Sequence, residues 1–265
     1  MADEPMRRVR SRDGVELAVW SSGSGAALLL VHGTAADHSR WDAVRSELAA
    51  HFTVYAMDRR GRGESGDTEP YRIEAEFDDV AAVVDSIGDD AVVVGHSYGG
   101  FCALEAARRT SAIAKLVLYE PPVGGAIAPD EAWLANAQDG IDRGEDEAVL
   151  ESFFVDVVGV STDELSKLRQ LPVWQARLKT VRTIAREFRE TVAYQFDASA
   201  LAKVKIPVLL LRGGDTDWSA EPTALLQDAL PDARTIVMAG QQHVAMDTGK
   251  AQFLQAVFEF LNVSD

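Results

Sequence analysis

Short apolar runs recur along the chain and alternate with longer amphipathic stretches. The runs are rich in Val, Leu and Ile and do not alternate strictly with polar residues, as is typical of parallel strands buried on both faces. Amphipathic stretches of helical length lie between them. The pattern predicts a doubly wound α/β fold, a mostly parallel sheet with helices on both faces. The runs cover residues 26–33, 52–58, 91–97, 113–122, 206–215 and 234–240.

The opening segment and the first amphipathic stretches add detail to this prediction. Residues 6–20 read as two strands of a hairpin that turns at Asp13-Gly14, since such a pair suits a tight turn between strands. Helices are expected between the buried runs. The helical stretches include residues 41–50, 77–88 and 101–110.

The alternation of strands and helices breaks once, between Pro121 and Lys205. No strand-like run occurs there, and apolar residues recur at helical spacing on one stripe of a long predicted helix. We interpret residues 121–205 as a helical cap, inserted after the sixth strand and lying over the carboxyl ends of the strands. Residues 1–120 and 206–265 then form the core. The stripe consists of Leu178, Val181, Ile184, Phe188 and Val192.

Charge and cysteine content exclude several classes of function. The chain has 26 basic and 42 acidic residues and a net charge of −16, which argues against nucleic acid as a partner. The single cysteine, Cys102, excludes an intrachain disulfide and a cysteine-rich zinc site. The sequence has no apolar run of membrane-spanning length and no apolar leader. We expect a cytoplasmic protein without metal, as a monomer or homodimer.

A glycine-rich turn carries the strongest chemical signal. Gly95-His96-Ser97-Tyr98-Gly99 follows an apolar strand directly and precedes a helix, the context that a nucleophile elbow requires. The glycines permit a sharp turn, which holds the serine strained and exposed. The alternative reading is an ordinary strand–helix turn with a bystander serine.

A second strand end provides a candidate oxyanion hole. His32-Gly33 ends the strand run at residues 26–33. In acyl transfer, preorganised N–H groups must stabilise the tetrahedral oxyanion. The backbone N–H groups of Tyr98 and Thr34 are the expected donors.

Acid and base candidates follow the last two strand runs. Asp215 and Asp217 lie in the Gly-Asp-rich loop after residues 206–213, and His243 lies in a loop after the final run. A triad acid orients the histidine and stabilises its imidazolium form. Only one of the two aspartates can have that role, and the other is then a turn-forming residue.

Together these features resemble the α/β-hydrolase superfamily, specifically its capped, single-domain serine hydrolases. The resemblance covers nearly the whole chain, and it implies an eight-stranded α/β-hydrolase sheet and the order Ser97, Asp217, His243 for the catalytic residues. The Asp58–Ser65 loop is similar to a structural loop of that family. Members with a G-D-x-D sequence after this strand usually employ the second aspartate, which favours Asp217 over Asp215.

Glu120 is the alternative acid. It lies 23 residues after Ser97, at the end of the run that precedes the cap. Some family members carry the acid at this earlier strand, as in the lactone-hydrolysing branch that resembles zearalenone hydrolase.

The predicted function is a cofactor-independent serine hydrolase that cleaves a small apolar carboxylic ester or lactone through an acyl-enzyme on Ser97. A mostly apolar cap suggests an apolar substrate pocket. Alternatives that keep the triad are a C–C bond hydrolase and a haloperoxidase-like perhydrolase. A further alternative is a non-catalytic ligand receptor on the same fold. The candidate pocket residues, which also suit core packing when taken singly, are Trp133, Phe153, Trp174, Trp218 and Met246.

Overall fold

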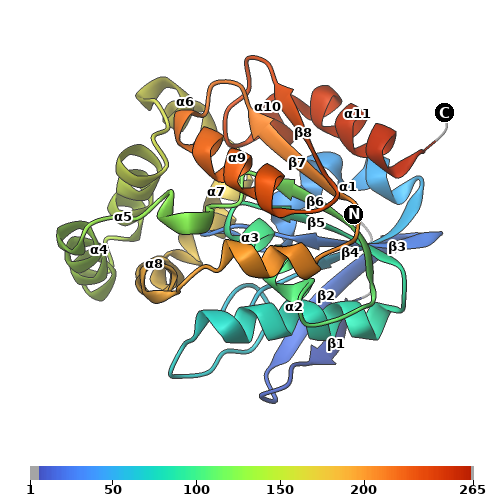
Figure 1. Ribbon diagram of the computed structural model, residues 1–265. Coiled ribbons are helices and arrows are strands. Elements are labelled where there is room, and N and C mark those ends of the chain that lie inside the picture. The colour runs from blue at the N-terminus through green and yellow to red at the C-terminus, as the bar shows by residue number, and fades with distance from the viewer. Residues whose placement is uncertain (1–5, 264–265) are drawn as a thin grey trace.

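The computed structural model describes residues 6–263. Within that range eight strands form one sheet in the order β1-β2-β4-β3-β5-β6-β7-β8, with helices on both of its sides (Figure 1). From β4 to β8 all neighbouring strands run parallel. The predicted eight-stranded, mostly parallel sheet is therefore confirmed. The strands are β1 (Met6–Arg10), β2 (Glu16–Gly23), β3 (Ala26–Val31), β4 (Phe52–Met57), β5 (Ala91–His96), β6 (Ile113–Tyr119), β7 (Val208–Gly213) and β8 (Ala233–Met238).

The hairpin at the start of the chain is present as predicted. Strands β1 and β2 pair antiparallel, and Ser11 N donates to Val15 O at 2.8 Å across the turn. Gly14 has a φ of 95°, a conformation that glycine adopts at low cost. β2 also pairs antiparallel with β4, so the hairpin extends the parallel part of the sheet at one edge.

Alternate residues of the buried strands enter two different cores. On β3, Leu29 and Val31 pack with α2, α3 and α9, whereas Leu28 and Leu30 pack with α1 and α11. Successive side chains of a strand point to opposite faces, so a continuous apolar run is what a sheet covered on both faces requires. The α-helices of the core are α1 (Asp42–Ala49), α2 (Ile73–Ile87), α3 (Tyr98–Ala106), α9 (Ala220–Ala229), α10 (Ala245–Thr248) and α11 (Lys250–Leu261).

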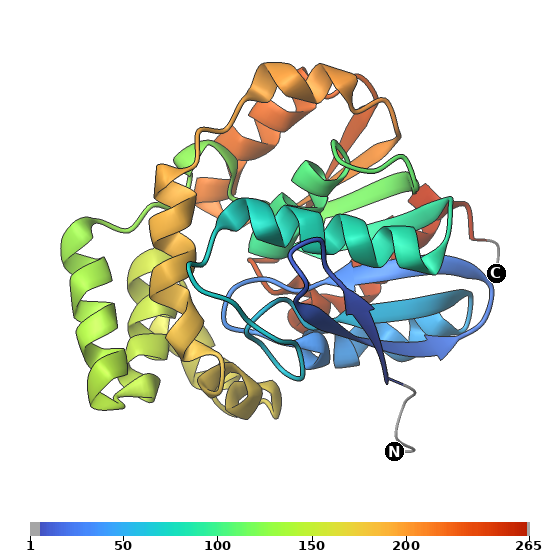
Figure 2. The ribbon, with the colours of Figure 1, turned by 90° about the horizontal axis from the view of Figure 1, so that it is seen from below.

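A helical insertion separates β6 from β7, after the sixth strand as expected. Figures 1 and 2 both place its green-to-orange helices beyond one end of the sheet. Its apolar side chains form a third core that also includes Ala35, after β3, and Val244, after β8. The insertion therefore packs on loops at the carboxyl ends of the strands. Its α-helices are α4 (Glu131–Arg143), α5 (Asp146–Ser152), α6 (Thr162–Leu168), α7 (Val173–Leu178) and α8 (Ile184–Ala193).

The prediction of one long helix across residues 178–192 is wrong, because the structure has shorter elements there. The chain forms α7, then the 3-10 turn η4 (Val181–Thr183), then α8. Thr180 Oγ1 donates to Arg177 O at 2.9 Å, and such side-chain bonds to the backbone compete with a regular helix. Val192, at the end of the predicted stripe, is 54% exposed.

Over residues 6–263 no helix is long and apolar enough to cross a membrane.

The remaining helical elements are short turns. The 3-10 turns are η1 (His38–Trp41), η2 (Val123–Gly125), η5 (Ala198–Lys203) and η6 (Asp217–Ser219), and η3 (Phe153–Val157) is a π-helical turn.

Candidate active site

Ser97 occupies the sharp turn between β5 and α3. Its φ is 54° and its ψ is −128°, a conformation that is strained for any residue with a side chain. Flanking glycines make the turn possible. A Cβ on Gly95 would lie 2.6 Å from Gly100 Cα, and one on Gly99 would lie 2.2 Å from His32 O. The local geometry is that of the nucleophile elbow expected from the sequence.

His243 makes a direct contact with Glu120. The distance from His243 Nδ1 to Glu120 Oε2 is 2.6 Å. The second carboxylate oxygen, Oε1, accepts from Gly213 N at 2.8 Å. Glu120 follows β6 directly and is 1% exposed. Because both oxygens have fixed partners in a buried setting, the carboxylate holds the imidazole in one orientation through Nδ1.

This contact contradicts the choice of Asp217 as the partner of His243. Asp217 begins the turn η6 and is exposed, as is Asp215. In the sheet, β6 lies next to β5, which carries Ser97, whereas β7 lies one strand further away. The Glu120 carboxylate therefore reaches the Nδ1 side of His243, and the Asp217 loop instead lines the cavity near the ring.

Two residues that the sequence did not single out for this role support the His243 loop. His96 Nε2 donates to His243 O at 2.8 Å. The Tyr119 hydroxyl donates to Gln242 O and accepts from Ala245 N. Burial and the neighbouring His243 hold the pKa of His96 well below its usual range, so the ring stays neutral. The one sequence feature that points to this supporting role is that Tyr119 directly precedes Glu120.

The candidate oxyanion loop lies against the elbow. A Cβ on Gly33 would lie 2.9 Å from Ser97 Cβ, so the backbone of this loop closely approaches the serine. His32 supports the loop as a neutral side chain: Nδ1 donates to Gly33 O and Nε2 accepts from Arg59 N. Burial and the Arg59 charge lower the pKa of His32 to about 3. Thr34, next in the chain, is 8% exposed, and its role as an oxyanion donor, like that of Tyr98, stays a prediction.

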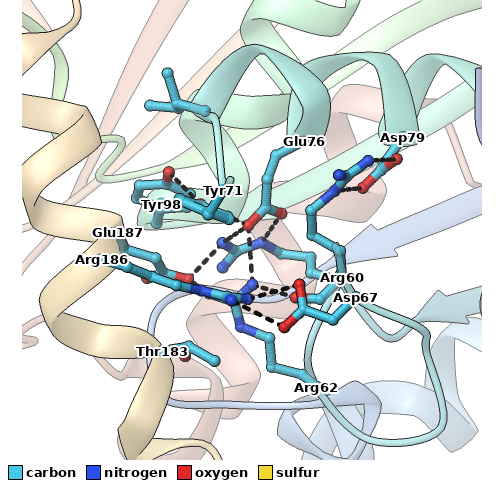
Figure 3. Close-up of polar contacts among 12 residues, drawn as sticks. Arg60, Arg62, Asp67, Tyr71, Glu76, Asp79, Tyr98, Thr183, Arg186 and Glu187 are labelled. Atoms are coloured by element: carbon cyan, nitrogen blue, oxygen red, sulfur yellow. Dashed lines mark hydrogen bonds and ion pairs between the residues drawn. The ribbon is translucent and has the colours of Figure 1, made fainter. Parts of the chain in front are cut away.

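The loop after β4 forms a buried ion-pair network beside the elbow (Figure 3). Arg59 donates to both oxygens of Glu76, at 2.8 Å each, and to Glu187 at 2.6 Å. Glu187 belongs to α8, so this network joins the cap to the core. Burial alone raises the pKa of Glu76, but the charges of Arg59 and Arg62 bring it well below its usual range.

The same network reaches the residue that follows the serine. The Tyr71 hydroxyl donates to Glu76 at 2.8 Å and lies 2.9 Å from the Tyr98 hydroxyl. The guanidinium of Arg59 stacks over the Tyr98 ring, 4.4 Å from its centre. These contacts hold the Tyr98 side chain in place, which agrees with the structural role that the family resemblance implies for residues 58–65.

The five candidate pocket residues have different positions. Trp218 lines a cavity of about 230 Å³ together with His243, and their ring centres are 5.2 Å apart. Phe153 and Trp174 are buried in the cap core, and Trp133 packs against it. Met246 is fully buried in the core with α1 and α11, so its prediction as a pocket residue is wrong. The loop after β8 leads into α10, which contains Met246, and the Met246 side chain packs into that core.

Within the part of the chain that the structure describes, no cluster of three His, Cys, Asp or Glu side chains is arranged to hold a metal ion. Cys102 is buried in α3. Burial raises the pKa of its thiol, so it is a packing residue.

Comparison with known proteins agrees with this geometry. The model of the alpha/beta hydrolase family matches residues 28–256. The chain belongs to this family. A pimeloyl-[acyl-carrier protein] methyl ester esterase from Nitrosospira multiformis is 37% identical over 124 residues, 45% of this chain and 47% of that protein. The match thus spans about half the length of that curated relative.

Two solved structures of alpha/beta hydrolases resemble the whole chain. An alpha/beta hydrolase from Sphaerobacter thermophilus is 30% identical, has a TM-score of 0.80, and matches 94% of this chain and 100% of its own. An esterase from Rhodococcus sp. ECU1013 is 25% identical and has a TM-score of 0.79. The match covers 97% of this chain and 98% of the esterase chain. The protein is therefore a hydrolytic enzyme of this family.

Proposed function

We propose that this hydrolase cleaves a carboxylic ester or lactone through an acyl-enzyme, with Ser97, His243 and Glu120 as its catalytic triad. The observation that carries the proposal is the 2.6 Å contact between Glu120 Oε2 and His243 Nδ1, combined with Ser97 at a strained elbow. The methyl ester esterase relative and the Rhodococcus esterase structure support the ester as the bond type.

Acylation begins with attack by Ser97 Oγ on the substrate carbonyl. His243 Nε2 accepts the hydroxyl proton as the new C–O bond forms, and the resulting imidazolium is stabilised by the Glu120 carboxylate. The oxyanion receives hydrogen bonds from the backbone N–H groups of Thr34 and Tyr98. Collapse of the tetrahedral intermediate breaks the bond to the alcohol, which leaves with the proton from His243.

Deacylation repeats these steps with water. His243 removes a proton from water as the oxygen attacks the acyl carbonyl, and Ser97 then leaves with that proton. The carboxylic acid is released. No cofactor takes part in the proposed cycle.

The cavity beside His243 suggests which part of the substrate it contacts. Trp218, Val158 and Val160 provide apolar walls, and Asp215 and Asp217 provide a polar rim. A substrate with a compact apolar group next to the scissile carbonyl suits these walls. The proposed partner is accordingly a small, neutral ester or lactone.

The test is a hydrolysis screen over short-chain, long-chain and aromatic esters together with lactones. Labelling by a fluorophosphonate probe is measured in parallel. We expect hydrolysis of at least one ester or lactone and labelling of the wild-type protein, with both lost in Ser97→Ala. The matched control is Ser46→Ala, an exposed serine of α1 that should keep both. If the probe labels the wild-type protein but no ester or lactone is hydrolysed, Ser97 remains supported as the nucleophile, but the proposal that the substrate is an ester or lactone is refuted. Full activity in Ser97→Ala would refute the mechanism.

A further inference from the structure

The cavity beside His243 is lined by carboxylates but by no lysine or arginine. In the described part of the chain its charged lining residues besides His243 are Asp215 and Asp217. A second cavity between the core and the cap, of about 460 Å³, differs in this respect. It is lined by two carboxylates and two cations, namely Asp37, Glu64, Lys179 and Arg182. The excess of negative charge is therefore a property of the cavity at His243 and not of every cavity in this acidic protein.

The charges of these two aspartates are not compensated by ion pairs. Both residues are exposed, and over residues 6–263 neither has a lysine, arginine or histidine within ion-pair distance. Arg212, near the end of β7, donates instead to Ser219 Oγ at 3.1 Å and to Thr216 O at 3.3 Å. The negative charges of the aspartates therefore act on any group that enters the cavity.

The small size of the cavity brings these charges close to a bound substrate. A volume of about 230 Å³ corresponds to a width of about 8 Å, less than the Debye length of about 10 Å at ~0.1 M salt. A charged group inside the cavity is thus within electrostatic range of both carboxylates. His243, which is 6% exposed, lines the same cavity. The two charges therefore lie beside the residue that we propose as the catalytic base.

We propose that Asp215 and Asp217 determine the charge selectivity of this hydrolase, because they disfavour esters and lactones whose body carries a negative charge. This selectivity rests on the proposed function, since it concerns the substrate of the same site. Repulsion between like charges weakens both the approach and the binding of an anionic substrate. Neutral substrates are not affected in this way. The role differs from that of a triad acid, because it requires charge at the cavity wall and no contact with His243.

The test compares two methyl esters that differ in charge but hardly in shape. Monomethyl glutarate carries a carboxylate at neutral pH, and methyl 4-carbamoylbutanoate is its neutral isostere. Methanol release gives kcat/KM for each. At low salt we expect kcat/KM to be about fivefold lower for the charged ester, the effect of two carboxylates about 8 Å away in water. Salt at about 1 M should remove most of this difference, because the Debye length falls to about 3 Å.

A double variant separates the effect of charge from that of shape. Asp215→Asn/Asp217→Asn should raise kcat/KM for monomethyl glutarate by about fivefold and so remove most of the preference for the neutral ester. The matched control is Asp89→Asn/Asp90→Asn, which changes the net charge equally. These exposed residues directly precede β5 and thus lie at the opposite end of the sheet, so the control should keep the wild-type preference.

Two results would overturn the proposal. One is a wild-type protein that does not prefer the neutral ester at low salt. The other is an equal preference in the two double variants, which would assign the selectivity to the net charge of the protein or to the shape of the cavity.

Failure of the proposed function would give a different result. If the fluorophosphonate probe labels the protein but neither methyl ester is hydrolysed, the concentration of each ester that halves the labelling rate replaces kcat/KM. We then expect the neutral ester to protect at the lower concentration, and equal protection by the two esters would overturn the selectivity. A wild-type protein that is not labelled at all would refute Ser97 as the nucleophile, and the selectivity with it.

Discussion

The loops that follow β6 and β7 both carry carboxylates at the same edge of the sheet, yet they differ in almost every physical respect. Glu120, after β6, is buried, has a φ of 46° and uses both oxygens on fixed partners. Asp215 and Asp217, after β7, are exposed. A position at a strand end brings a carboxylate to the edge of the sheet where His243 lies. Burial and strand order then decide which of these carboxylates contacts His243.

The two loops are also mechanically connected. Gly213, the last residue of β7, donates its N–H to Glu120 Oε1. The end of β7 therefore supports the Glu120 carboxylate, although no carboxylate of the β7 loop contacts His243 in the described part of the chain. This arrangement predicts distinct effects for changes in the two carboxylates, in the connecting backbone and in the tyrosine next to Glu120.

The largest effect is expected from exchanging the two carboxylates for amides. Glu120→Gln should lower kcat/KM for the ester found in the screen by about 10³- to 10⁴-fold, because the imidazolium loses its counter-charge and its correct tautomer. Asp217→Asn should stay close to wild type because its carboxylate is exposed. Steady-state kinetics on both folded variants provides the measurement, and the reverse ranking would restore Asp217 as the acid.

A smaller effect is expected from the backbone that connects the loops. A Cβ on Gly213 would lie 2.5 Å from Gln241 O and 2.9 Å from Gln242 O, so Gly213→Ala should displace the His243 loop. Misplacing a catalytic group by about 1 Å costs up to about a hundredfold, and we expect a loss of kcat in that range.

The neighbouring glycine offers a matched control for this substitution. A Cβ on Gly214 would lie 3.2 Å from Met238 O and 3.4 Å from Ala239 Cα, which smaller shifts can accommodate. Gly214→Ala should therefore lose much less kcat than Gly213→Ala. Equal losses in the two variants would show that strain in β7, and not the link to Glu120 and His243, controls the rate.

The smallest effect is expected at Tyr119. Tyr119→Phe removes the bonds of the hydroxyl to Gln242 O and Ala245 N but keeps the ring and Glu120. We expect a severalfold loss of kcat with KM nearly unchanged, and a decrease of about 1 kcal/mol in the free energy of unfolding. Denaturant titration and kinetics would check both. A collapse comparable to that of Glu120→Gln would mean that the loop has no support besides this hydroxyl.

Much of the fold was predictable because its signals are local. Apolar runs of strand length, glycine at their ends and the Asp13-Gly14 turn indicated the sheet and the hairpin. The positions of Ser97, at a sharp turn from strand to helix, and of His243, in the loop after the last strand, follow from the same local signals. The break at Thr180 was not, because a threonine that bonds to Arg177 O carries no breaker signal of the kind that glycine or proline gives.

The sequence does not determine which carboxylate contacts His243, for a different reason. Glu120 and Asp217 follow neighbouring strands, so both come to the same sheet edge. Which one meets His243 depends on how the loop after β8 turns its ring, and that turn is set by His96 and Tyr119 across the sheet. The burial of Met246 in the core is likewise not evident from the sequence, because apolar character does not reveal which side of a loop is buried.

The most direct test of the central claim, that Glu120 orients His243, is proton NMR of the imidazole N–H groups in protein labelled with ¹⁵N-histidine. A strong bond to a carboxylate moves the Nδ1 proton far downfield. His38 also contacts a carboxylate, Asp58, at 2.7 Å, so His38→Gln identifies that second signal. We expect the His243 signal to persist in His38→Gln and Asp217→Asn and to move upfield or disappear in Glu120→Gln. A signal that persists in Glu120→Gln and is lost in Asp217→Asn would contradict it.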